Sequence, residues 1–162
     1  MKFHVVRRVS HAQSPFRVVE QATGHEVGWI NRFLDREYVR RLADNTLRMY
    51  AHELLHFIRW WESVHHTAAI AAGDLTESTL LDYVRFQSAQ QPRPTGSTIN
   101  HRVAIADRAL RNEFPDSPCQ VAPGFSSSLF AAQADGTRET APGDEPLARE
   151  DLQTQHRAVV RR

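Results

Sequence analysis

The chain has 162 residues, and 20 Lys and Arg side chains against 19 Asp and Glu give it a formal net charge of +1 at pH 7. This length suits one domain rather than two, and a balanced charge does not by itself indicate a nucleic-acid partner. Apolar runs of only a few residues argue against a membrane span or a secretory signal, and one cysteine, Cys119, excludes an internal disulfide framework. We therefore expect a cytoplasmic protein.

Near the N-terminus, two short runs rich in β-branched and aromatic residues cover positions 16–20 and 26–30. Between them, Gly24 can take the positive φ that a hairpin loop needs. We predict a small β-hairpin formed by these two runs, in an N-terminal extension over residues 1–34. A lone hairpin is marginally stable, so it must pack on another part of the chain.

From residue 35 to 115 the apolar spacing becomes helical. Tyr50, Leu54, Phe57 and Trp61 follow one another at steps of four, three and four, which places them on one core-facing stripe. The pattern predicts a helix that begins with a cap at Asp44 or Asn45 and ends near residue 64.

Two further helices are expected in the same region. Asp74 or Thr76 can cap the first of them, which fades near Gln90 before a breaker-rich loop over 92–96. Ser97 can cap the next, which ends at Phe114. After residue 115 we expect at most one short helix, over 126–134, in a linker and largely disordered tail covering 116–162, because residues 134–146 are rich in Gly, Pro, Thr and acids.

The most recognisable motif is His-Glu-Leu-Leu-His at residues 52–56, which matches the zinc-protease pattern. One helical turn separates His52 from His56, Glu53 could act as general base, and Glu77 is a possible third ligand. A zinc hydrolase is therefore one alternative. However, His52, His56 and Arg59 are predicted opposite the apolar stripe, where a solvated polar face explains them without a metal.

A second pattern runs through the same helix. Thr46, Tyr50, Leu54, Phe57 and Trp60-Trp61 are spaced as in the first long helix of the core-binding domain of tyrosine recombinases, or phage integrases. The segment Ser97-Thr98-Ile99-Asn100-His101-Arg102 resembles the Thr-Ile-Asn-Arg-Arg-like start of a later helix in that family. The resemblance covers about residues 16–115. It implies a mainly α, SAM-like four-helix domain, here preceded by a small β-hairpin.

The resemblance also implies a function, since this domain forms one arm of a clamp around double-stranded DNA. Arginines would contact phosphates, the start of a helix offers backbone donors, and Asn100 or His101 could reach base edges. Arg108 and His56 lie on the same two predicted faces. The candidate DNA-binding residues are Thr46, Arg48, His52, Arg59, Ser97, Thr98, Asn100, His101 and Arg102.

The family's catalytic domain carries an active-site tyrosine downstream, and no tyrosine follows Tyr83 in this chain. We therefore expect no enzymatic activity, no metal and no cofactor. The expected partners are recombination-site DNA and, in addition, intact recombinase protomers. A helical protein-interaction module without DNA affinity is the second alternative.

Overall fold

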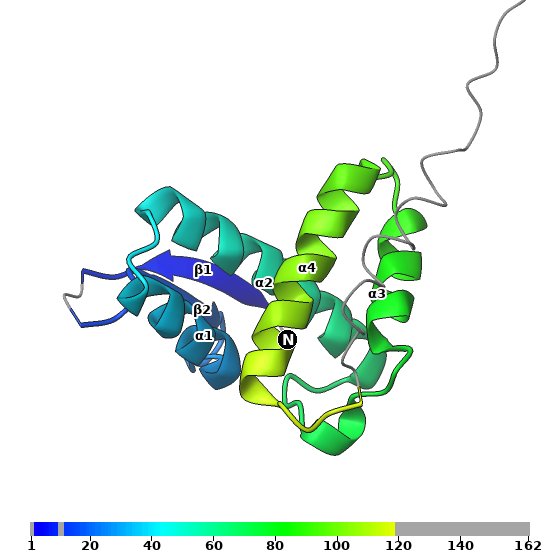
Figure 1. Cartoon of the computed structure of the whole chain (residues 1–162), viewed down its shortest axis with the longest axis horizontal. Helices are drawn as coiled ribbons and strands as arrows, with labels where there is room; N and C mark the ends of the chain where they lie inside the picture. Colours follow the sequence, from blue (N-terminus) through cyan, green and yellow to red (C-terminus); the bar gives the residue numbers. More distant parts are fainter. Residues whose placement is uncertain (1, 10–11, 119–162) are drawn as a thin grey trace, which may run out of the picture.

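The structure is a computed structural model that describes residues 2–9 and 12–118. These residues form a mainly helical fold in which a two-stranded antiparallel hairpin precedes four α-helices (Figure 1). This agrees with the helical class and the hairpin expected from the sequence. The elements, in chain order, are β1 (Phe3–Arg7), β2 (Phe16–Glu20), α1 (Gly28–Val39), α2 (Asp44–His65), a 3-10 turn (Ala72–Asp74), α3 (Thr79–Ser88) and α4 (Gly96–Glu113).

The strand over residues 16–20 pairs with residues 3–7, and not with residues 26–30 as predicted. β2 pairs with β1 in a register that runs from Phe3 opposite Glu20 to Arg7 opposite Phe16. The predicted second strand over 26–30 is wrong, because only Glu26 joins the sheet, through an isolated bridge to Val19. Gly24 does adopt the positive φ expected of it, at 70°.

Residues 26–30 instead lead into α1, because their apolar side chains follow a helical period. Trp29, Ile30, Phe33 and Leu34 are all buried, and their spacing places them on one side of a helix. The domain boundary predicted between residues 34 and 35 consequently falls inside α1. Buried side chains of the hairpin and of the helices form a single cluster, so the hairpin is part of the helical core.

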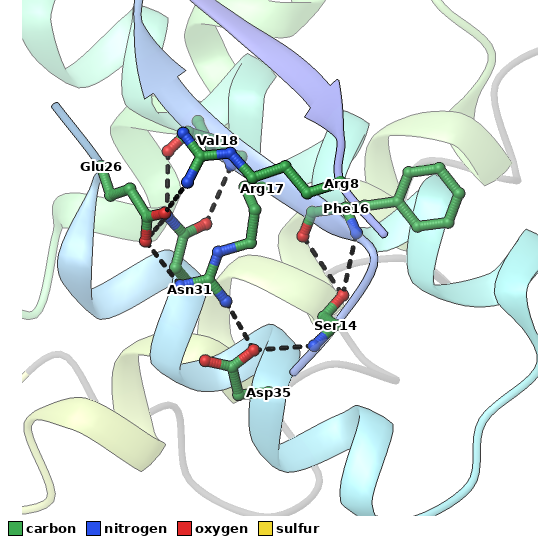
Figure 2. Close-up of polar contacts among 8 residues, drawn as sticks. All are labelled: Arg8, Ser14, Phe16, Arg17, Val18, Glu26, Asn31 and Asp35. Carbon is green, nitrogen blue, oxygen red and sulfur yellow. Dashed lines mark hydrogen bonds and ion pairs between the residues drawn. The ribbon is translucent and has the colours of Figure 1, made fainter. Parts of the chain in front are cut away.

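A polar network fastens the hairpin to α1 (Figure 2). The nearly buried guanidinium of Arg17 on β2 donates to Glu26 and to Asp35, both at 2.5 Å. Asn31 accepts from the Val18 amide at 2.9 Å and donates to its carbonyl at 3.0 Å. The hydrogen bond from Arg17 lowers the pKa of the Glu26 carboxyl. Because both terminal nitrogens of Arg17 and the Asn31 amide find partners, burying them costs less than their charge alone would suggest, although Arg17 Nε has no hydrogen-bond partner among the described residues.

α2 is the central helix, and its C-terminal half is buried on several sides. Leu54, Leu55, Phe57, Ile58, Trp60 and Trp61 are all buried. The Phe57 ring lies between aromatic side chains, edge-on to Trp29 at 6.1 Å and to Tyr83 of α3 at 5.1 Å. Tyr50, expected on the core-facing stripe, is half-buried and stacks on Phe33 of α1. The core therefore centres on the C-terminal half of α2.

The predicted capping residues differ from the observed ones by one to four positions. α2 begins at Asp44 after Ala43, without a side-chain cap, and ends at His65. α3 follows Ser78, while Thr76 donates its amide to the Thr79 hydroxyl instead of capping. For α4 the cap is Thr95, whose hydroxyl accepts from the Thr98 amide, because Gly96 is already helical.

One buried carboxylate joins α1 to α4. Glu37 of α1 is completely buried and accepts hydrogen bonds from Arg108 of α4 and, at 3.2 Å, from Arg40. The Arg108 guanidinium also lies over the rings of Phe33 and Tyr50, at 5.7 and 5.6 Å from their centroids. Removing Arg108 would leave the buried Glu37 carboxylate with only the more exposed Arg40 as a partner among the described residues.

The predictions for the C-terminal tail concern residues that the structure does not describe. The short helix expected over 126–134, the disorder expected over 134–146 and Cys119 all lie outside the described residues.

Candidate nucleic-acid interface

Two of the predicted DNA contacts, both in the N-terminal half of α2, are exposed and unbonded among the described residues. Arg48 and His52, one helical turn apart, are exposed and make no hydrogen bond or ion pair within the described ranges 2–9 and 12–118. Thr46, in the first turn, is half-buried, and its amide donates to the Ala43 carbonyl at 2.9 Å. Arg48 and His52 are therefore able to meet a ligand without breaking an internal bond.

The C-terminal half of the same face is not a free solvated surface, contrary to the sequence prediction. Arg59 is exposed, but its guanidinium donates to the Phe3 carbonyl of β1 at 2.6 Å. Leu55 shares this side of the helix and is buried. The hairpin covers the face that helical periodicity placed opposite the core, so Arg59 fastens β1 to α2.

His56 also turns inward. Its Nδ1 lies 2.8 Å from the Tyr83 hydroxyl, and its ring contacts Phe86 of α3 at a centroid distance of 6.2 Å. Burial, with a further contribution from the charge of Arg102, lowers the pKa of His56 to about 4. Burial likewise raises the pKa of Tyr83. The imidazole is therefore neutral near pH 7.

The side chains of the His-Glu-Leu-Leu-His motif do not converge. His52 is exposed, Glu53 accepts from Arg102 at 2.9 Å, and His56 is hydrogen-bonded to Tyr83. Glu77 is exposed in the loop before α3. Across the part of the chain that the structure describes, no three His, Cys, Asp or Glu side chains are grouped so as to hold a metal ion. In this arrangement Glu53 and His56 make separate contacts, and His52 makes none among the described residues.

On α4, too, some of the predicted DNA contacts are exposed and others are partly enclosed by the fold. Ser97 is exposed at the start of the helix, Asn100 is half-buried, and the Thr98 hydroxyl lies 2.9 Å from that of Thr95. His101 is half-buried, and its Nε2 is buried without a hydrogen-bond partner among the described residues. The first-turn amides of α4 are not used by the helix itself, as at every helix start.

Arg102 was predicted to face DNA but is instead held inside the fold. Its guanidinium donates to Glu53 of α2 at 2.9 Å and reaches Gln87 of α3 at 3.5 Å. Only 21% of its side chain is exposed. Arg102 therefore joins three helices, and a phosphate contact would require it to leave Glu53.

A shallow hollow of about 470 Å³ lies elsewhere, where the hairpin turn, the start of α1, residues 67–70 and the end of α4 meet. Phe3, Val27, Trp29 and Phe114 supply apolar walls, and Arg32 and Glu113 stand at its rim. The lining includes none of the predicted DNA contacts. No local sequence pattern indicates this hollow, because its walls come from four distant segments.

Comparison with protein-family models, with curated proteins and with solved structures finds no significant match to this chain. Within the described residues, no helix combines the length and the apolar character that crossing a membrane requires. The geometry of the chain itself is therefore the basis for assigning a function.

Proposed function

We propose that this protein binds double-stranded DNA through the exposed side chains on the N-terminal half of α2 and at the start of α4. The observation that carries the proposal is the pair Arg48 and His52, which project from α2 with no partner inside the described fold. A guanidinium is suited to a phosphate oxygen, and an imidazole can donate to phosphate or to a base edge. Exposed basic side chains that no internal carboxylate neutralises are what a polyanion would bind.

The start of α4 supports the same proposal. Ser97 is exposed there beside the first-turn amides, and anions are favoured at a helix N-terminus because backbone N–H groups and the helix dipole point toward them. α2 and α4 are in contact through Glu53 and Arg102 and through Tyr50 and Arg108. The side chains of α2 and α4 could therefore contact one DNA duplex without a change in how the two helices pack.

The internal bonds of Arg59 and Arg102 remove these two residues from the proposed DNA contacts. Arg102 is bonded to the Glu53 carboxylate, and Arg59 joins α2 to the Phe3 carbonyl of β1, so we assign both a structural role. The proposed contacts are Arg48, His52, Ser97 and Asn100. From the resemblance to recombinase core-binding domains, we extend the proposal to DNA of a recombination site.

The test is a titration of the purified protein with a short labelled duplex at low and high salt. Binding driven by phosphate contacts must weaken steeply as salt rises. We expect Arg48→Gln to weaken binding about fivefold and to reduce the salt slope by about 0.9, the value of one phosphate contact. The charge-matched control is Arg85→Gln on α3, whose side chain is 74% exposed and paired with Asp82.

Two results would oppose the proposal. The first is the absence of any duplex binding by the wild-type protein at low salt, which would favour an interaction module without DNA affinity. The second is an equal loss of affinity in the Arg48 and Arg85 variants, which would show that net charge alone is responsible.

A further inference from the structure

We infer a second phosphate-binding surface on the side of α1 that faces the end of α4, and we call it the arginine face. It consists of Arg32, Arg36, Arg40, Arg41 and Arg108. This inference rests on the proposed function, since it assigns a further contact to the same duplex DNA. It uses side chains that the sequence analysis did not single out, apart from Arg108.

The spacing along α1 brings the arginines together. Arg32, Arg36 and Arg40 follow at intervals of four residues, so they lie on one side of the helix over about 12 Å of its axis. Arg41 comes directly after the helix and is exposed, with a positive φ of 61°. Three arginines thus share one side of α1, and Arg41 adds an exposed positive charge just beyond its C-terminal end.

Contacts with α4 show that this surface continues onto that helix, whose C-terminal part adjoins α1 in Figure 1. Arg32 donates to Glu113 and Arg36 donates to Asn112 at 2.5 Å, both in the last turn of α4. Arg108, one turn earlier on α4, reaches back to Glu37 of α1. The arginine face is therefore one surface made by two helices.

Charge is layered on this face. The guanidinium side chains lie outermost, since those of Arg32 and Arg40 are 63% and 61% exposed. The carboxylates lie beneath them, because Glu37 is fully buried and only 22% of the Glu113 side chain is exposed. Five arginines against these two carboxylates leave a net charge of three positive units, with the positive groups facing solvent.

Two of the five have no carboxylate partner in the described part of the chain. Arg36 bonds to a neutral amide, and Arg41 forms no ion pair there, while Asp44, three residues further on, pairs with Arg7 of β1 at 3.7 Å. A phosphate could bind these two guanidinium groups without competing with an internal anion. Planar guanidinium groups match phosphate oxygens well, and duplex DNA presents a phosphate about every 1.7 Å along its axis.

The test compares the variant Arg36→Gln with Arg41→Gln against the control Arg85→Gln with Arg93→Gln, which removes the same charge from α3 and the loop after it. Both are titrated with a short duplex over a range of salt concentrations. We expect the first variant to bind about tenfold more weakly at low salt and to lose about 1.8 units of the salt slope. The control should keep the wild-type slope.

Failure of the inference can be told from failure of the proposed function. If the wild-type protein binds duplex with an Arg48-dependent slope but the Arg36 and Arg41 variant keeps that slope, the arginine face is not a phosphate surface. If polyglutamate competes with the duplex as strongly as unlabelled duplex does, and loses that ability in the Arg36 and Arg41 variant, the face binds acidic polymers generally and the inference is overturned. Circular dichroism of each variant checks that the fold is intact.

Discussion

The two halves of α2 each carry an arginine and a histidine on the face predicted to be polar, but these residues have opposite roles. In the N-terminal half, Arg48 and His52 point away from the fold and bind nothing within its described part. In the C-terminal half, His56 and Arg59 occupy similar positions on the helix but bond to Tyr83 and to the Phe3 carbonyl. The difference comes from what each side chain meets, because Arg59 lies against the Phe3 end of β1 and His56 lies against α3, while Arg48 and His52 bond to neither of these described elements. Polar residues that recur at helical spacing therefore do not necessarily form one continuous exposed surface.

The largest expected effect that separates the halves is on stability. Phe57→Ala should lower the free energy of unfolding by about 3–5 kcal/mol, since the Phe57 ring is fully buried among Trp29, Trp60, Trp61 and Tyr83. Met49→Ala, at a position that is 39% exposed in the other half, should cost less than about 0.5 kcal/mol. Urea denaturation measures both, and comparable losses would contradict the contrast.

A second difference should appear as pH falls. His56 is neutral in the fold because burial lowers its pKa to about 4, while an unfolded histidine has a pKa of about 6.5. The unfolded state therefore gains a proton first, and stability is lost as the pH drops below about 6.5. Between pH 7 and pH 5 this one group should remove about 2 kcal/mol.

The variant His56→Gln should flatten that pH dependence, whereas His52→Gln in the exposed half should keep it. Denaturation midpoints recorded from pH 7 to pH 5 provide the measurement. The same fall in both variants would mean that other groups are responsible for it.

A smaller effect is expected at Arg59. Arg59→Met keeps most of the apolar stem but loses the bond to the Phe3 carbonyl, so the hairpin should be held less firmly, at a cost of about 1–2 kcal/mol. Arg48→Met should leave stability within about 0.5 kcal/mol of the wild type. Protease cleavage near residues 2–9 should also become faster in the Arg59 variant alone. If both variants unfold alike, Arg59 does not fasten β1.

Periodicity predicted α2, α3 and α4, because local spacing determines which side chains a helix can bury, but the start of α1 was predicted as a strand. It also contained an unused signal, since Leu54, Leu55, Phe57, Ile58, Trp60 and Trp61 surround the C-terminal half of α2. A helix that is apolar on most sides must be covered on most sides. That argument would have predicted that Arg59 and His56 are partly enclosed, although it could not name β1 and α3 as the cover.

The pairing of distant groups could not be predicted in the same way. β2 has two possible neighbours in the sequence, and the choice of β1 depended on 26–30 being needed for α1. Glu53 and Arg102 are 49 residues apart, and nothing in either local pattern indicates that they meet. The sequence therefore indicated that the candidate residues lie on helices, but it did not indicate which of their side chains are free and which are bonded within the fold.

The buried carboxylate of Glu37 has a consequence for how the chain is made. Its partner Arg108 follows 71 residues later, so while the chain emerges from a ribosome Glu37 lacks this partner until α4 has been synthesised. A fragment ending before residue 96 would have to bury Glu37 without Arg108 or leave α1 open to water. Residues 2–118 should consequently fold late and as one unit, and a nascent chain stalled in the loop before α4 should remain sensitive to protease.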